Sequence, residues 1–158
     1  MTKAIKKILV LTLLATTLTA CGSGQTAETR MIKQVTDGVE AQSAEIRLRN
    51  VLIVKTATND AVLVGTLVSW SDEPDVITGI SINNIPATLS APSFDLVKNK
   101  PVIFVGDSTN ADAYIPGLYK VAGERIPVTF SFATAAPVTV DALVLNSEGF
   151  YKDLVRSN

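Results

Sequence analysis

Histidine is absent from the 158-residue sequence, and cysteine occurs only once, at Cys21. Without histidine the chain cannot build a Ser-His-Asp or Cys-His nucleophilic site of the usual kind. A single cysteine excludes an intramolecular disulfide. No serine stands in a recognisable arrangement with a lysine that replaces these groups. We therefore expect a protein that is not an enzyme.

Methionine is also scarce, with only Met1 and Met31. Imidazole, thiolate and thioether groups are the donors that Cu(I) prefers, and imidazole is the commonest ligand of transition metals in general. The sequence therefore predicts no tightly bound metal. We expect no cofactor in the ordinary sense.

The N-terminal stretch has the pattern of an export signal. Lys3, Lys6 and Lys7 precede an apolar run over residues 8–15. This run is too short for a membrane-spanning helix, which needs about 20 apolar residues. Small residues then lead to a break, as in secretory signal peptides. We predict a signal peptide over residues 1–20.

The segment Leu18-Thr19-Ala20-Cys21 resembles the bacterial lipobox, in which the cysteine thiol takes a diacylglyceryl group before cleavage on its N-terminal side. An incidental thiol is the alternative. A free exposed thiol is a liability in an oxidising exported compartment, and lipidation removes it. Stable anchoring requires more than one acyl chain, and bacterial lipoproteins carry two or three. The motif predicts lipid attachment at Cys21 and a location on the outer face of the cytoplasmic membrane.

The net charge is small. Cleavage after residue 20 removes three of the fourteen basic residues and none of the fifteen acidic ones, which leaves eleven against fifteen and a formal charge of −4. This balance gives no electrostatic footprint for nucleic acid. It also gives no basic patch for anionic lipid headgroups. Attachment to the membrane is therefore expected to depend on the acyl chains and on protein contacts.

From residue 44 onward, short apolar segments alternate with turn residues. The clearest is Ile126 to Phe132, in which alternate residues are apolar, as in a strand with one buried face. The alternation slips by one residue at Asn50, which predicts a β-bulge. Seven or eight such segments at roughly ten-residue spacing, without a long helical pattern, predict an all-β fold. We expect an antiparallel β-sandwich of the cupredoxin or immunoglobulin type.

The predicted organisation is a single domain with two flanking segments. Residues 21–43 are expected to form a lipidated tether, because their first residues are small and polar. Residues 44–146 form the β-sandwich. Residues 147–158 read as a polar C-terminal tail whose few apolar side chains dock locally.

The densest acidic group is Asp72, Glu73 and Asp75, in a turn that also contains Pro74. It is a solvated turn, a charged docking edge or a Ca²⁺ contact. Calcium requires six or more oxygens, commonly in a loop with a glycine, which this turn lacks. Trp70 precedes the turn and is either a core side chain or an exposed anchor for a partner, since tryptophan is favoured at interface hot spots. These residues are candidate partner contacts.

Five segments in order carry a family resemblance: residues 63–68, 75–82, 115–118, 123–132 and 137–140. They resemble the periplasmic copper chaperones of the PCu(A)C type. Together with the lipobox and residues 29–39, the chain is more closely similar to the actinobacterial LpqE-type lipoproteins. That resemblance implies an accessory lipoprotein on the outer face of the cytochrome bcc–cytochrome oxidase supercomplex.

The chaperone family binds copper through paired histidine and methionine ligands, including a His-x-Met motif. Aligned on Gly117 and Leu118, the positions of this motif are Asp112, Ala113 and Tyr114. Carboxylate and phenol are poor substitutes for soft ligands. We therefore expect the chaperone fold without its copper, and we keep Asp112 and Tyr114 as candidate partner contacts.

The leading hypothesis is a lipid-anchored, non-enzymatic subunit that binds a membrane protein complex. One alternative is a copper-handling chaperone with non-standard ligands. Another is a cell-envelope solute-binding or biogenesis factor, for which a deep apolar pocket would be the sign.

Overall fold

The computed structural model describes residues 36–152 and residue 154. Nearly all regular structure in this part of the chain is β-structure, which confirms the all-β prediction. No helix in the described ranges is long and apolar enough to cross a membrane. The elements are β1 Val39–Ser43, β2 Ile46–Lys55, β3 Ala61–Ser69, β4 Asp75–Ile82, β5 Ile85–Pro86, β6 Thr88–Leu89, β7 Phe94–Leu96, β8 Val102–Ile103, β9 Ala113–Ile115, β10 Arg125–Phe132, β11 Val138–Asn146 and the 3₁₀ turn η1 Gly149–Tyr151.

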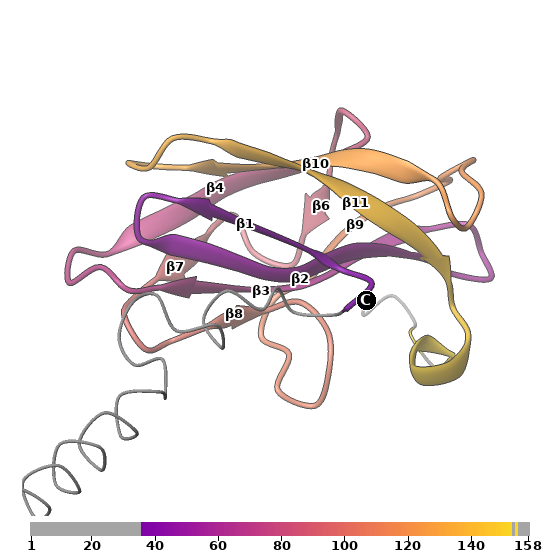
Figure 1. Ribbon diagram of the computed structural model, residues 1–158, viewed down its shortest axis with the longest axis horizontal. Coiled ribbons are helices and arrows are strands. Elements are labelled where there is room, and N and C mark those ends of the chain that lie inside the picture. The colour runs from indigo at the N-terminus through magenta and orange to yellow at the C-terminus, as the bar shows by residue number, and fades with distance from the viewer. Residues whose placement is uncertain (1–35, 153, 155–158) are drawn as a thin grey trace, which may run out of the picture. The chain divides into compact units, whose positions relative to one another are not determined.

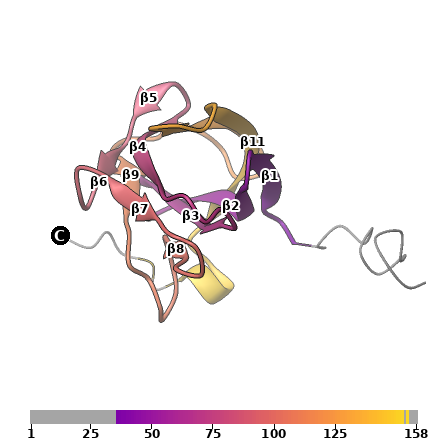
Figure 2. The same cartoon turned by 90° about the vertical axis from the view of Figure 1, so that its left-hand side faces the viewer.

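The long strands form two layers that share β11 (Figure 1). In one layer β10 lies between β4 and β11, and both pairings are antiparallel. In the other layer β2 lies antiparallel to β1 and β3. The last residues of β11 leave the first layer and pair with the end of β2. The strand order β5-β4-β10-β11-β2-β3-β9-β6 thus curls into a near-barrel (Figure 2).

Three details differ from the predicted sandwich. The pairing of β11 with β2 is parallel, because β11 crosses from one layer to the other. Eleven strands occur in the described residues instead of seven or eight, because β1 precedes the predicted domain and the short pieces β5 and β7 form in the connections. The segment predicted as a tether to residue 43 ends in a strand, since β1 pairs with β2. The β-structure therefore begins at Val39.

The core lies between the two layers and consists of alternate residues of the long strands. In β10 the predicted alternation is confirmed, with Ile126, Val128, Phe130 and Phe132 all buried. Phe94 and Phe104 meet edge to face in the same core, with ring centroids 5.8 Å apart. Burial of these apolar side chains is the main stabilising contribution to the fold.

The predicted bulge at Asn50 is also confirmed. The register between β2 and β3 shifts between Arg49 and Leu52, and Asn50 has a φ of 51°. Asparagine tolerates this left-handed conformation better than most residues. Gly38 packs directly on Asn50, at the point where the chain enters β1.

A second, smaller apolar cluster lies apart from the main core. Leu52, Val54 and Val64 form it, on β2 and β3. The C-terminal segment covers this cluster with Tyr151 and Leu154. The expected local docking of the tail therefore occurs through these two side chains, whereas Phe150, which was also expected to dock, is exposed.

The strand directions define two ends of the domain. β2 ends at Lys55 and β3 begins at Ala61, beside the end of β11 at Asn146, and we call this the hollow end. The opposite end carries Trp70 and the acidic turn, since β3 runs antiparallel to β2. We call it the tryptophan end.

Candidate binding surfaces

Cys21, the predicted lipid-attachment residue, lies outside the described residues. The described part of the chain contains no histidine, cysteine or methionine. It also contains no group of three or more acidic side chains placed to hold a metal ion. Any site in this part of the chain must therefore be built from hard polar groups and apolar surface.

Asp75 is the one buried carboxylate at the tryptophan end. Its Oδ1 accepts hydrogen bonds from the backbone N–H groups of Val76 and Thr134, at 2.7 and 2.9 Å, and its Oδ2 accepts one from Ala135 at 2.8 Å. Burial raises the pKa of Asp75, but hydrogen bonds from these backbone N–H groups and that of Ala133 outweigh it and lower the pKa overall. Asp75 therefore connects the start of β4 to the turn after β10 through hydrogen bonds. Its carboxylate does not belong to the exposed acidic group that Asp72 and Glu73 form.

Asp72 and Glu73 are exposed, as expected for a turn. The Asp72 carboxylate accepts a hydrogen bond from Lys98 Nζ at 2.6 Å, in an ion pair that is open to solvent. Such pairs contribute little to stability. The turn therefore presents a partly neutralised charged edge.

Trp70 is 56% exposed, so the core alternative is wrong for this side chain. The Arg47 guanidinium lies 4.8 Å from the centroid of its ring, in a cation–π contact. The Nε atom of Arg47 is buried and has no hydrogen-bond partner. Tryptophan and arginine are the residue types most enriched at interface hot spots. Sequence reasoning missed Arg47. It lies on β2 and pairs with Val68 near the end of β3, which places it beside Trp70.

Asp112 immediately precedes β9, and Tyr114 lies within it. Tyr114 pairs with Val62 of β3 and with Thr88 of β6. The flanking Ala113 points into the core, so the two candidate side chains lie on the opposite, outer face of the strand. Both are half-buried. This pair is far along the strand from Trp70 and its acidic turn, so the candidate contacts do not form one site.

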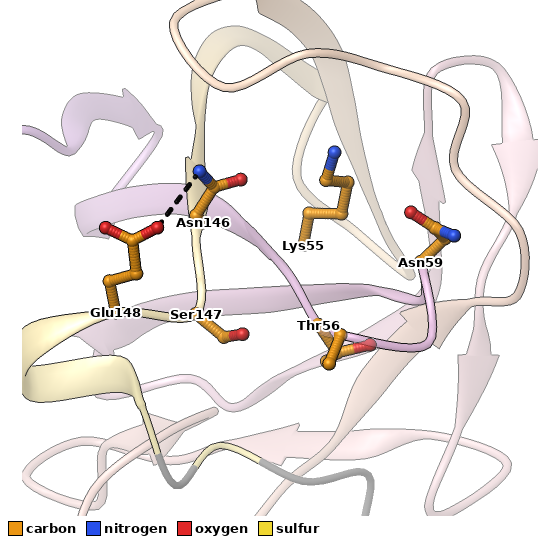
Figure 3. A pocket seen from close by; sticks show the side chains of 7 residues that line it. Lys55, Thr56, Asn59, Asn146, Ser147 and Glu148 are labelled. Carbon is orange, nitrogen blue, oxygen red and sulfur yellow. Dashed lines mark hydrogen bonds between the residues drawn. The ribbon is translucent and has the colours of Figure 1, made fainter.

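The hollow end carries an open hollow of about 260 Å³ (Figure 3). Its lining is polar, with Lys55 and Asn59 on one side and Asn146 and Glu148 on the other. Lys55 Nζ donates a hydrogen bond to the backbone carbonyl of Lys120 at 3.2 Å. The hollow is unlike the deep apolar pocket that a solute-binding function needs.

Exposed apolar side chains occur in two segments that are hydrogen-bonded to Lys55 at this end or follow it in the chain. Tyr119 is 94% exposed and Val121 is 67% exposed, in the loop whose Lys120 carbonyl accepts the hydrogen bond from Lys55. Phe150, in η1, is 85% exposed. Sequence reasoning missed all three as candidate contacts, because only the loop position after Pro116 and Gly117 marks Tyr119 and Val121, and the apolar pattern of the tail predicts local docking for Phe150.

No protein-family model matches the sequence, and no curated protein matches it. Solved structures match by fold. The copper-bound PCuAC domain from PmoF2 superposes with a TM-score of 0.58 and 19% identity, over 68% of this chain and 98% of that one. The apo PCuAC domain from PmoF1 gives a TM-score of 0.57 and 13% identity, over 67% and 98%. At these identities the likeness shows a PCuAC-like β-fold and nothing further.

Proposed function

We propose that this chain is an exported, lipid-anchored binding subunit that uses a copper-chaperone-like fold without a copper site. In this proposal Cys21 carries the lipid, and the domain acts without catalysis on the outer face of the cytoplasmic membrane. The partner is a membrane protein complex, with the cytochrome bcc–cytochrome oxidase supercomplex as the specific candidate. Neither nucleic acid nor a tightly bound metal takes part.

The observation that carries this proposal is the contrast between fold and chemistry. The chain shares the fold of a copper-bound PCuAC domain, yet its described residues contain no soft ligand and no acidic cluster placed for a metal. The surface instead presents Trp70 and Arg47, the residue types of interface anchors. A protein–protein contact therefore explains this surface better than metal transfer does.

Affinity purification of the tagged full-length protein in mild detergent tests the partner. We expect subunits of the respiratory supercomplex to co-purify with it. Recovery of envelope-synthesis enzymes alone would contradict the proposed partner. Trp70→Ala should lower the recovery at least fivefold, whereas Ile85→Ala, a matched loss of a half-exposed apolar side chain elsewhere, should not.

The lipid anchor is tested separately with Cys21→Ser. This substitution removes the only thiol, so the protein should lose its labelling by palmitate and leave the membrane fraction. Ser23→Ala, a change two residues away, is the control and should keep both properties. A Cys21→Ser protein that stays on membranes and remains functional would contradict the anchor.

A further inference from the structure

Arg47 and Trp70 lie side by side on the outer face of β2 and β3. The two neighbours of Arg47 in the chain, Ile46 and Leu48, are buried in the core, so the Arg47 side chain lies on the opposite face of β2. Val68 pairs with Arg47, and Trp70 follows Val68 by two residues and therefore lies on the same face. The two side chains form one surface, which we call the Arg47–Trp70 pair.

The guanidinium of this pair has no hydrogen-bond or ion-pair partner in the described part of the chain. Its Nε atom is buried and unpaired, which is rare for a buried polar group and costs folding free energy. The two terminal Nη groups stay open to solvent. The indole ring of Trp70 covers one face of the guanidinium. A binding partner can therefore reach Arg47 at its Nη end.

Arg49, two residues further along the same face of β2, makes the contact that Arg47 lacks. Its guanidinium forms an ion pair with the carboxylate of Glu40 on β1. Gln42, an uncharged residue of β1, takes the position opposite Arg47. No carboxylate of the described residues forms an ion pair with Arg47. Arg47 is thus a guanidinium that the described domain leaves without a counterion.

We infer that the Arg47–Trp70 pair binds a segment of a partner protein that carries one carboxylate side chain beside an apolar side chain. The carboxylate accepts hydrogen bonds from the Nη groups, and the apolar side chain covers the exposed indole ring. This inference rests on the binding function proposed above and adds the chemistry of the contact. Arginine and carboxylate form two parallel hydrogen bonds that are strong and geometrically specific. Because the guanidinium is already stacked on the indole ring, binding orders little that is not ordered before.

Acidic side chains around the pair favour a single carboxylate over a phosphoryl group. Glu45 and Glu73 are exposed, and the Glu45 carbonyl accepts a hydrogen bond from the Trp70 backbone N–H at 3.0 Å. Lys98, a cation of this end, already pairs with Asp72. A phosphoryl group carries up to two negative charges. One guanidinium neutralises a single carboxylate fully but a phosphoryl group only in part.

Carbodiimide coupling in native membranes tests this contact. A carbodiimide activates a carboxylate as an O-acylisourea, and an amine in contact then displaces the urea and forms an amide. Arginine does not react in this way, so Arg47→Lys introduces an amine at the site and keeps its charge. Mass spectrometry of the tagged full-length variant should find an amide between position 47 and an aspartate or glutamate of another protein. Arg49→Lys is the matched control, because its amine should couple to Glu40 of the same chain.

Arg47→Gln tests the same contact without a coupling reagent. We expect the recovery of co-purifying chains in mild detergent to fall at least fivefold, whereas Arg49→Gln should change it less than twofold. Because Arg47 has no hydrogen-bond partner in the described residues, Arg47→Gln should lower the thermal midpoint no more than Arg49→Gln does. The comparison of midpoints separates a loss of binding from a loss of folding.

Two failures are distinguishable. The carboxylate contact is wrong, and the binding function stands, if partner chains co-purify with the wild type but Arg47→Gln leaves their recovery unchanged. The same holds if the amine at position 47 forms no amide with another protein, or couples only within its own chain or to a second copy. If no chain co-purifies with the wild-type protein, the proposed function fails and this inference fails with it.

Discussion

Asp75 joins the start of β4 to the turn after β10, two segments about sixty residues apart in the sequence. Its carboxylate accepts hydrogen bonds from Val76, Thr134 and Ala135. Charge-assisted hydrogen bonds contribute about 1.5–3 kcal/mol each. Asp75→Asn replaces one acceptor oxygen with a donor, so it should lower the free energy of unfolding by about 2–4 kcal/mol. Urea denaturation measures this, with Asp72→Asn as the exposed control that should cost less than about 1 kcal/mol.

The contribution of Asp75 should also depend on pH. Burial raises its pKa, but the backbone hydrogen bonds lower the net value in the folded protein. The unfolded chain then binds the proton more readily, so the stabilisation is complete above the unfolded pKa of about 3.9 and is lost as the pH falls through the lower folded pKa. The stability difference between wild type and Asp75→Asn should therefore shrink below about pH 4. A difference that stays constant from pH 7 to pH 2.5 would contradict this assignment.

At the scale of elements, β1 depends on the contact between Gly38 and the bulge. A Cβ at Gly38 would lie 2.4 Å from Asn50 Oδ1 and 2.5 Å from the Asn50 carbonyl carbon, which is backbone and cannot turn aside. Gly38→Ala should therefore displace β1 and destabilise the domain by about 1–3 kcal/mol. Gly79→Ala has no atom within 4 Å of the new methyl group and is the control. Equal stability of the two variants would show that β1 is not held at this point.

The C-terminal segment provides a second pair of matched variants. Tyr151 covers the cluster of Leu52, Val54 and Val64, whereas its neighbour Phe150 is exposed. Tyr151→Ser should lower the free energy of unfolding by about 1–3 kcal/mol, because apolar surface is uncovered. Phe150→Ser should change it by less than about 0.5 kcal/mol. Thermal unfolding compares the two variants. If both substitutions lower the midpoint equally, Tyr151 does not cover the small apolar cluster as described.

The elements that sequence reasoning found are those with a strong local pattern. The alternation of β10 and the slip at Asn50 both follow from which face of a strand is buried, and both are confirmed. β1 was missed because Val39–Ser43 consists mostly of small and polar residues and has no clear apolar alternation. It forms a strand because it pairs with the neighbouring β2. The role of Asp75 was missed for a similar reason, since its partners lie at Thr134 and Ala135. Contacts between distant segments leave no local signal.

At the scale of the whole molecule, the fold resembles that of copper-binding domains, whereas the described residues include no soft metal ligand. The β-fold matches that of PCuAC domains, one of them copper-bound. Asp112 and Tyr114, which the sequence resemblance predicts to occupy the positions of a copper-binding motif, lie on the outer face of the chain at β9 and carry oxygen donors. Oxygen donors bind Cu(I) weakly compared with sulfur and imidazole. We therefore propose that the domain is a PCuAC-like β-fold without a copper site.

Anaerobic Cu(I) titration against a competing chelator tests this central claim most directly. The Cys21→Ser protein is the right sample, because this substitution removes the only cysteine thiol of the chain. We predict that the chelator keeps essentially all of the copper, since the domain offers no soft ligand. Retention of one Cu(I) per chain at sub-micromolar affinity would contradict the account and restore a copper-handling function.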